Sequence, residues 1–178
     1  MSNTWVYADP HFFHPGICKF TRRDGTPLRP WDDAEEMSEM MIYEYNKVVK
    51  PEDRVYILGD VAMNRKSLDK CLPRLMGRKV LVKGNHDIDK LSYYSKYFDD
   101  IRAYVCKKGF IMSHIPIHPA SLGRWDLNIH GHLHDGKVMD GGLEPWSPED
   151  DRYRCVSVEH TNYKPILLSY VLENKGLT

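Results

Sequence analysis

Apolar residues along the chain fall into short runs that alternate with longer segments of helical periodicity. The runs at residues 4–8, 54–58 and 79–82 contain β-branched and aromatic residues and end in polar turns, which predicts buried strands. Between them, residues 32–49 and 67–75 carry apolar side chains at helical spacing. This β–α–β–α–β order predicts parallel strands joined by helical crossovers.

The helix predicted at residues 32–49 carries the clearest local signals. Asp32 is suited to cap its first turn, and Glu35, three residues on, completes a capping box. Pro51 ends the helix. One apolar face recurs at helical spacing, and we interpret it as core packing. That face comprises Met37, Met40, Met41, Tyr45 and Val48.

The second half of the chain is rich in short strand-like runs. An aromatic-rich helix is predicted at residues 89–97. The predicted strands are residues 103–106, 110–113, 127–130, 155–158 and 166–171. Short connections between them favour antiparallel pairing. Residues 16–30 and 136–154 are irregular and are predicted to be surface loops.

Length and composition narrow the class of protein. The 178 residues fit one domain, residues 1–178, with enough length for a sizeable core. The formal net charge is zero, so composition does not imply a large basic face for nucleic acid. No signal peptide is visible at residues 1–6, and no apolar stretch is long enough to cross a bilayer. The four cysteines form no C-x-x-C pair and are interpreted as structural thiols. A reducing cytoplasm is the expected setting.

Histidine and aspartate gather in five short fragments, each directly after a predicted strand. The fragments are Asp9-Pro10-His11, Gly59-Asp60, Gly84-Asn85-His86-Asp87, Ser113-His114 and Gly131-His132-Leu133-His134. Loops at the carboxyl ends of strands bring distant residues together on a rigid base. Residues i and i+2 of an extended chain point the same way, so Asp9 and His11 are expected to grip one ion together. A single carboxylate has two oxygens and can bridge two cations. The mixed oxygen and nitrogen donors suit Mn²⁺, Fe, Ni²⁺, Zn²⁺ or, less well, Mg²⁺.

In this order the fragments resemble the calcineurin-like metallophosphoesterase family, whose pattern is D-x-H, G-D, G-N-H-[DE], H and G-H-x-H. The match spans residues 9–134. Residues 9–84 are also similar to a small phage and bacterial branch of predicted phosphoesterases. In that branch D-x-H-F leads to a second histidine, here His14, and D-x-V-Y-x-L-G-D matches residues 53–60. The resemblance implies an α/β fold, a four-layer sandwich of two mixed β-sheets flanked by helices, with metals at one edge.

The resemblance also implies a centre of two divalent metal ions, with Mn²⁺ the first choice. The expected ligands of one ion are Asp9, His11 and His134. Those of the other are Asn85, His114 and His132, and Asp60 bridges the two. His86 is the expected non-ligand histidine near the leaving oxygen, as an imidazolium that stabilises charge or donates a proton, and Asp87 is expected to orient its ring. The implied reaction is attack of a metal-bridged hydroxide on phosphorus, in line with the leaving group.

Contacts to the substrate have weaker signals. Candidate phosphate-binding side chains are His14, Arg23, Arg65 and Arg124. The default interpretation of each arginine is a solvated surface residue, and the alternative for His14 is a structural hydrogen bond. Trp125 and Trp146 are candidates for stacking on a base. The alternative interpretation is that both side chains are buried against the domain. His130 is assigned a core or supporting role.

The sequence indicates an enzyme, a phosphoric ester hydrolase acting on a phosphorylated small molecule or nucleic acid, without a membrane partner. Because 178 residues leave little room for a cap domain, the site is expected to be open, which favours a phosphodiester in a nucleotide or nucleic-acid end. The alternatives are a phosphomonoesterase acting on nucleotides or phosphoprotein, and a non-catalytic metal-binding scaffold. The protein-phosphatase branch is disfavoured because its G-D-x-x-D-R-G motif is absent after Gly59. The oligomeric state is not indicated.

Overall fold

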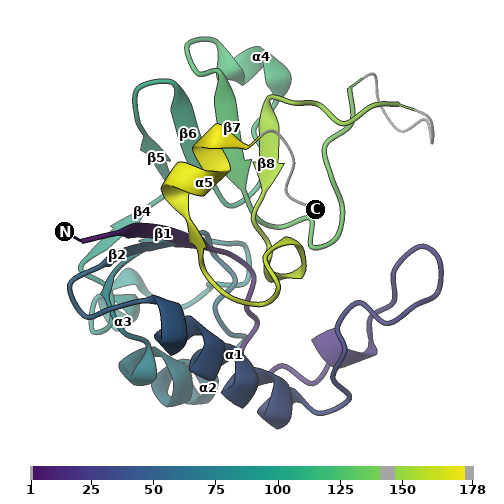
Figure 1. Cartoon of the computed structure of the whole chain (residues 1–178). Coiled ribbons are helices and arrows are strands. Elements are labelled where there is room, and N and C mark those ends of the chain that lie inside the picture. The colour runs from purple at the N-terminus through teal and green to yellow at the C-terminus, as the bar shows by residue number, and fades with distance from the viewer. Residues whose placement is uncertain (1, 141–146, 175–178) are drawn as a thin grey trace.

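Two mixed β-sheets pack face to face in the computed structural model, which describes residues 2–140 and 147–174 (Figure 1). In the first sheet the strand order is β4-β3-β2-β1-β9. Its strands are β1 (Thr4–Tyr7), β2 (Arg54–Ile57), β3 (Arg78–Val82), β4 (Asp100–Arg102) and β9 (Ile166–Leu167). The first four run parallel, and β9 is antiparallel to β1. The parallel β–α–β–α–β prediction is therefore confirmed, although the sequence pattern did not reveal β4.

The second sheet has the order β5-β6-β7-β8. Its strands are β5 (Tyr104–Cys106), β6 (Phe110–Ser113), β7 (Leu127–His130) and β8 (Tyr153–Cys155). Only β5 and β6 are antiparallel, whereas β6, β7 and β8 are parallel. The prediction of antiparallel pairing in this half is wrong for these strands. Their connections are long crossovers, the first of which contains α4 (Pro119–Leu122).

Helices flank the paired sheets. The outer face of the first sheet is covered by α1 (Ala34–Val48), α2 (Arg65–Cys71) and α3 (Leu91–Tyr94) (Figure 1). The chain also contains α5 (Leu168–Glu173) and the 3-10 helices η1 (Ile17–Lys19), η2 (Leu72–Arg74) and η3 (Val158–His160). The fold class is thus the expected α/β sandwich of two mixed sheets with flanking helices. No helix of the described residues is long and apolar enough to cross a membrane.

Alternation along the strands separates two cores. Trp5 and Tyr7 face the helices, and Val6 and Ala8 face the second sheet, because successive side chains of a strand point to opposite faces. The same alternation runs through β2 and β3, which makes the first sheet apolar on both faces. A strand buried on both faces lets its carboxyl-end loop start from a rigid position.

Helix α1 begins one residue later than predicted. Its N-cap is Asp33, whose side chain accepts a hydrogen bond from the Glu36 amide at 2.8 Å. The chain offers the same capping-box spacing in both registers, so spacing alone did not choose between them. Met40, which was predicted to face the core, is 45% exposed. Ile42, which was not assigned to that face, is buried instead.

The end of the chain also differs from its prediction. Only Ile166–Leu167 of the predicted strand 166–171 pairs with β1, and the chain then turns into α5. Short apolar runs do not distinguish a strand from a buried helical turn. The strand predicted at residues 155–158 lies earlier, at β8, and Val158 instead opens η3.

Candidate metal centre

Loops that follow five strands meet at one edge of the sandwich and bring together most of the predicted ligands. Asp9, His11 and Asp60 form one group whose ligand atoms lie within 4.8 Å of one another, and Asp60, His114 and His132 form a second. Asp60 belongs to both groups. Its Oδ2 lies 3.6 Å from His11 Nε2 and 3.5 Å from His114 Nε2. The structure therefore contains two overlapping Asp/His triads of a kind that holds metal ions.

The backbone at these loops is unusual. Five predicted ligands have positive φ, the left-handed region that side chains other than glycine rarely adopt. They are Asp9 (56°), His11 (47°), Asp60 (53°), His132 (70°) and His134 (52°). The expectation of an extended Asp9-x-His11 segment is thus wrong: both residues are left-handed, and this conformation directs their side chains into the site. Each such residue costs about 1–2 kcal/mol, a strain that clusters at functional sites.

Three glycines allow the loops to approach this closely. A Cβ on Gly84 would lie 2.3 Å from Asp60 Oδ1, and one on Gly131 would lie 2.4 Å from Asp9 Oδ2. At Gly59, φ is +84°, and a Cβ would meet His114 Nδ1 at 2.5 Å. All three glycines are therefore required by space, and Gly59 is required by its positive φ as well.

Buried polar atoms without partners indicate what the centre is built to hold. Asp9 Oδ1 and both ring nitrogens of His11 are buried and have no hydrogen-bond partner among the described residues. Burial raises the pKa of Asp9 to about 6 and lowers that of His11 to about 2. A neutral imidazole is the form that binds metal, and unpaired buried polar groups are costly unless an ion pairs them. The donor set fits divalent metal ions with mixed nitrogen and oxygen ligands.

The remaining two predicted ligands lie beside the triads. Asn85 Oδ1 is 2.8 Å from His114 Nε2, and the His11 and His134 ring centroids are 5.3 Å apart. His114 Nδ1 donates to the Leu58 carbonyl at 2.8 Å, which leaves Nε2 as the nitrogen that faces Asp60 and Asn85. This is the arrangement by which proteins fix the tautomer of a metal-binding histidine.

His86 lies exposed at the rim of the centre. Its ring centroid is 5.7 Å from that of His11, and its backbone amide donates to Asp60 Oδ1 at 2.9 Å. Asp87 is fully buried, and its carboxylate accepts hydrogen bonds from the amides of Asp60, Val61 and Gly84 at 2.8–3.1 Å. Among the described residues its hydrogen bonds go to backbone amides and not to the His86 ring. Asp87 therefore holds two loops together, which differs from its predicted role.

Sequence reasoning missed a buried network behind the first triad. Arg29 is 1% exposed and donates to the carbonyls of Asp9 and Pro10, both at 2.7 Å, and to Glu159 Oε1 at 2.8 Å. Glu159 Oε1 lies 3.2 Å from His134 Nδ1. Burial acts to raise the pKa of Glu159, but His134 and Arg29 lower it overall, so the carboxylate is charged. No local signal distinguishes Arg29 from other arginines of its irregular segment.

Ser157 is a second residue that the sequence did not single out. Its hydroxyl donates to Asp9 Oδ2 at 2.7 Å, and the His132 amide donates to the same oxygen at 2.9 Å. Asp9 Oδ1 is left without a hydrogen-bond partner among the described residues and remains available to an ion. The second sheet thus orients the carboxylate that the first sheet supplies.

Of the predicted substrate contacts, only His14 lies next to the triads. Its ring centroid is 6.0 Å from that of His11. Arg65 pairs with Asp89 at 2.7 Å, and Arg124 lies over the Trp125 ring at 4.8 Å. Arg23 is exposed on a turn.

Trp125 and His130, the other candidates that the structure describes, belong to neither triad. Trp125 packs against the outer core of the second sheet, and Trp146 lies outside the described residues. His130 is buried, with Nδ1 2.8 Å from the Gly131 carbonyl, in agreement with a core role.

Comparison with known proteins identifies relatives in sequence and in structure. No family model matches the chain. The chain is 33% identical over 91 residues to the Gene 66 protein of Mycobacterium phage L5, covering 49% of this chain and 41% of that protein. A protein of unknown function from Aquifex aeolicus, AQ665, has a solved structure that superposes with a TM-score of 0.70, 28% identity and coverage of 97% and 99% of the two chains. The chain is 30% identical over 176 residues to the uncharacterized protein MJ1445 of Methanocaldococcus jannaschii, covering 97% of this chain and 91% of MJ1445. The chain therefore belongs to the same protein family as MJ1445.

Proposed function

We propose that the chain is a metal-dependent phosphoesterase that hydrolyses a phosphodiester in a nucleotide or at a nucleic-acid end. The observation that carries this proposal is the pair of buried Asp/His triads that share Asp60. Two divalent ions, when bound side by side, neutralise phosphate charge and lower the pKa of water. A site with one shared carboxylate is suited to such a pair.

Seven side chains divide between the two ions in this proposal. Asp60 is common to both ions. The first set is completed by Asp9, His11 and His134, and the second by Asn85, His114 and His132. In the described residues Glu159 and the Leu58 carbonyl hold His134 and His114 in the required ring orientations.

His86 is the proposed acid near the leaving oxygen. It lies outside both triads, it is exposed, and its backbone is fixed by the hydrogen bond to Asp60. A histidine in this position can donate a proton or stabilise negative charge without occupying a metal position.

The preference for a diester follows from access. Asn85 and His86 are both exposed, so the rim beside the second triad is open to solvent. An open rim accepts a substrate with chain on both sides of the phosphate, whereas a small monoester benefits from an enclosed pocket. A phosphomonoesterase is the second candidate within the same chemistry.

Hydrolysis of bis-p-nitrophenyl phosphate and of p-nitrophenyl phosphate by the Mn²⁺-loaded full chain tests the proposal. We expect faster turnover of the diester, followed by activity on cyclic nucleotides or short oligonucleotides. Preference for the monoester would reverse the substrate assignment. No hydrolysis by a chain with metal bound would favour the non-catalytic scaffold.

Two variants separate metal binding from catalysis. His86→Ala should retain both metals and lose about 10²–10⁴-fold in turnover, the usual contribution of a positioned acid. Asp60→Asn should lose metal, measured by elemental analysis after gel filtration. Wild-type turnover in both variants would refute the assignment of the site.

A further inference from the structure

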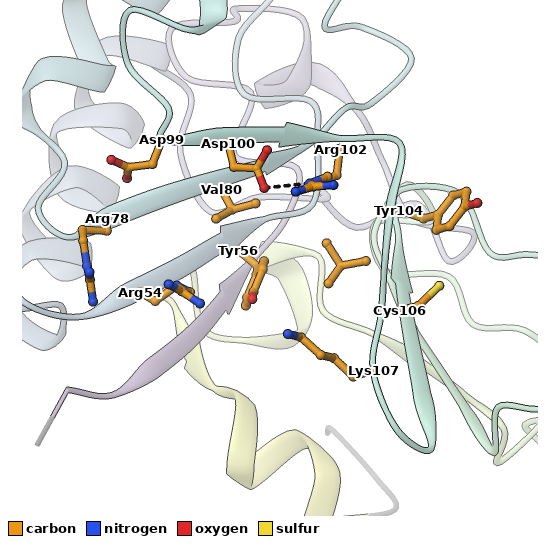
Figure 2. Close-up of a pocket in the computed structure, with 11 residues that line it drawn as sticks. Arg54, Tyr56, Arg78, Val80, Asp99, Asp100, Arg102, Tyr104, Cys106 and Lys107 are labelled. Atoms are coloured by element: carbon orange, nitrogen blue, oxygen red, sulfur yellow. Dashed lines mark hydrogen bonds and ion pairs between the residues drawn. The ribbon is translucent and has the colours of Figure 1, made fainter.

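A cavity lies at the opposite end of the first sheet from the metal centre, and Figure 2 shows the residues that line it. Its volume is about 600 Å³. Arg54 and Arg78 begin strands β2 and β3, whereas Asp60 and Asn85 follow the other ends of these parallel strands. Six residues of extended chain span about 20 Å, so the cavity and the metal centre are separate sites.

The cavity is the open end of the space between the two sheets. Tyr56 and Val80 belong to the apolar core between the sheets, and Arg54 and Arg78 occupy the same faces of β2 and β3 two residues earlier. Lys107, which follows β5 of the second sheet, extends toward them from the other side (Figure 2). Both sheets therefore supply cations to one concave surface.

The cavity is lined by four cations, Arg54, Arg78, Arg102 and Lys107, and by two carboxylates, Asp99 and Asp100, so positive charge exceeds negative charge by two. Arg102 is paired with Asp100, with Nε 2.6 Å from Oδ2. Arg54, Arg78 and Lys107 have no ion-pair or side-chain hydrogen-bond partner in the described part of the chain, although the chain as a whole has no net charge. The cavity therefore keeps a net positive charge, which raises the local potential and favours a negatively charged ligand.

The geometry identifies the chemistry of that ligand. Arg54 and Arg78 are direct neighbours in the β2–β3 register, so their guanidinium groups are placed to hold adjacent phosphate groups by paired hydrogen bonds. The Tyr56 side chain, 5% exposed, makes no hydrogen bond among the described residues and offers a further donor. The volume matches that of small-molecule sites. We propose that this cavity binds a small molecule with two or more linked phosphate groups.

Calorimetric titration of the full chain in EDTA tests this proposal without the metal centre. The ligands are inorganic pyrophosphate and tripolyphosphate, with orthophosphate and a short single-stranded oligonucleotide for comparison. We expect saturable binding of the linked phosphates, at least tenfold tighter than orthophosphate. Because no hydrolysis is measured, the outcome is independent of the proposed function.

Matched variants locate the binding. Arg54→Gln/Arg78→Gln should weaken affinity at least tenfold, and Lys107→Gln should weaken it to a smaller extent. The control Lys66→Gln/Lys108→Gln removes the same charge from exposed positions outside the cavity and should leave affinity within twofold. Amide chemical shifts of the labelled chain should move at residues 104–107.

The proposal would be overturned by absence of linked-phosphate binding, by equal loss of affinity in the control variant, or by shifts confined to the metal-centre loops. Binding of the oligonucleotide alone would also overturn it, because it would indicate a strand-binding surface in place of a small-molecule cavity.

Discussion

Replacement of Arg29 by methionine tests whether the buried network supports the metal centre. Methionine keeps most of the apolar length of the side chain but removes the donors to Glu159 and to the carbonyls of Asp9 and Pro10. The Arg29 and Glu159 side chains are 0% and 1% exposed, so water cannot replace the lost bonds. Removal of one partner from a buried ion pair costs about 3–5 kcal/mol. We expect Arg29→Met to lose this much free energy of unfolding.

Urea denaturation followed by circular dichroism measures this loss, and the surface supplies its control. Arg74 pairs with Glu39, but their side chains are 41% and 43% exposed. Exposed pairs contribute about 0–1 kcal/mol, so Arg74→Met should have little effect. A loss of less than 1 kcal/mol in Arg29→Met would refute the inference that the network supports the loops of the first triad.

The same network should influence metal affinity. Glu159→Gln keeps the size of the side chain but removes the charge that faces His134 Nδ1 at 3.2 Å. Loss of such a partner lowers metal affinity by about 10–100-fold. Titration with Mn²⁺ in a competition assay measures this change. Unaltered affinity would show that Glu159 serves stability alone.

Three further predictions follow from the site and from the core. Removal of metal by EDTA should lower the melting temperature, and Mn²⁺ at 100 times its dissociation constant should raise the free energy of unfolding by about 2.7 kcal/mol. A melting temperature unchanged by EDTA would argue against a metal centre. Gly84→Ala should destabilise the chain and abolish metal binding because its Cβ would lie 2.3 Å from Asp60 Oδ1, whereas Gly25→Ala, with open space around it, should cost only about 1–2 kcal/mol of backbone strain. Iodoacetamide should label exposed Cys106 in the native chain but not buried Cys71, whose pKa burial raises to about 12, and mass spectrometry of peptides would identify the labelled thiol.

The local sequence pattern predicted β1, β2 and β3 of the first sheet because each is encoded by one short stretch of consecutive residues. The strands that begin at Thr4 and at Arg54 are each a short apolar run between polar turns, and the helices that link the parallel strands have clear apolar periodicity. The strands of the second sheet were predicted near their observed positions, but antiparallel pairing is correct only for β5 and β6 and wrong for β7 and β8. The direction of β7 and β8 depends on how long connections cross the sheet, which the runs themselves do not encode.

The residues of the candidate site that belong to sequence motifs could be predicted, and the others could not. The order of the fragments identified the residues that the structure assembles into triads around Asp60. The Arg29–Glu159 pair joins positions 130 residues apart and has no motif. The left-handed backbone at His132 and the loop-bridging role of Asp87 depend on tertiary contacts, so residue type alone did not reveal them.

Backbone contacts at the metal centre also join the two sheets mechanically. A Cβ on Gly131, from the second sheet, would lie 3.1 Å from the Leu58 carbonyl oxygen of the first, and within the first sheet a Cβ on Gly59 would lie 2.6 Å from the Gly84 Cα. Two further bonds cross the same edge, from the His132 amide to Asp9 and from the Val158 amide to the Ala8 carbonyl. Because the backbones of these loops are in close contact and hydrogen-bonded across the two sheets, one loop cannot open without the others. Amide hydrogen exchange should therefore give the same opening free energy for the loops of both sheets at this edge, as expected for one cooperative opening event.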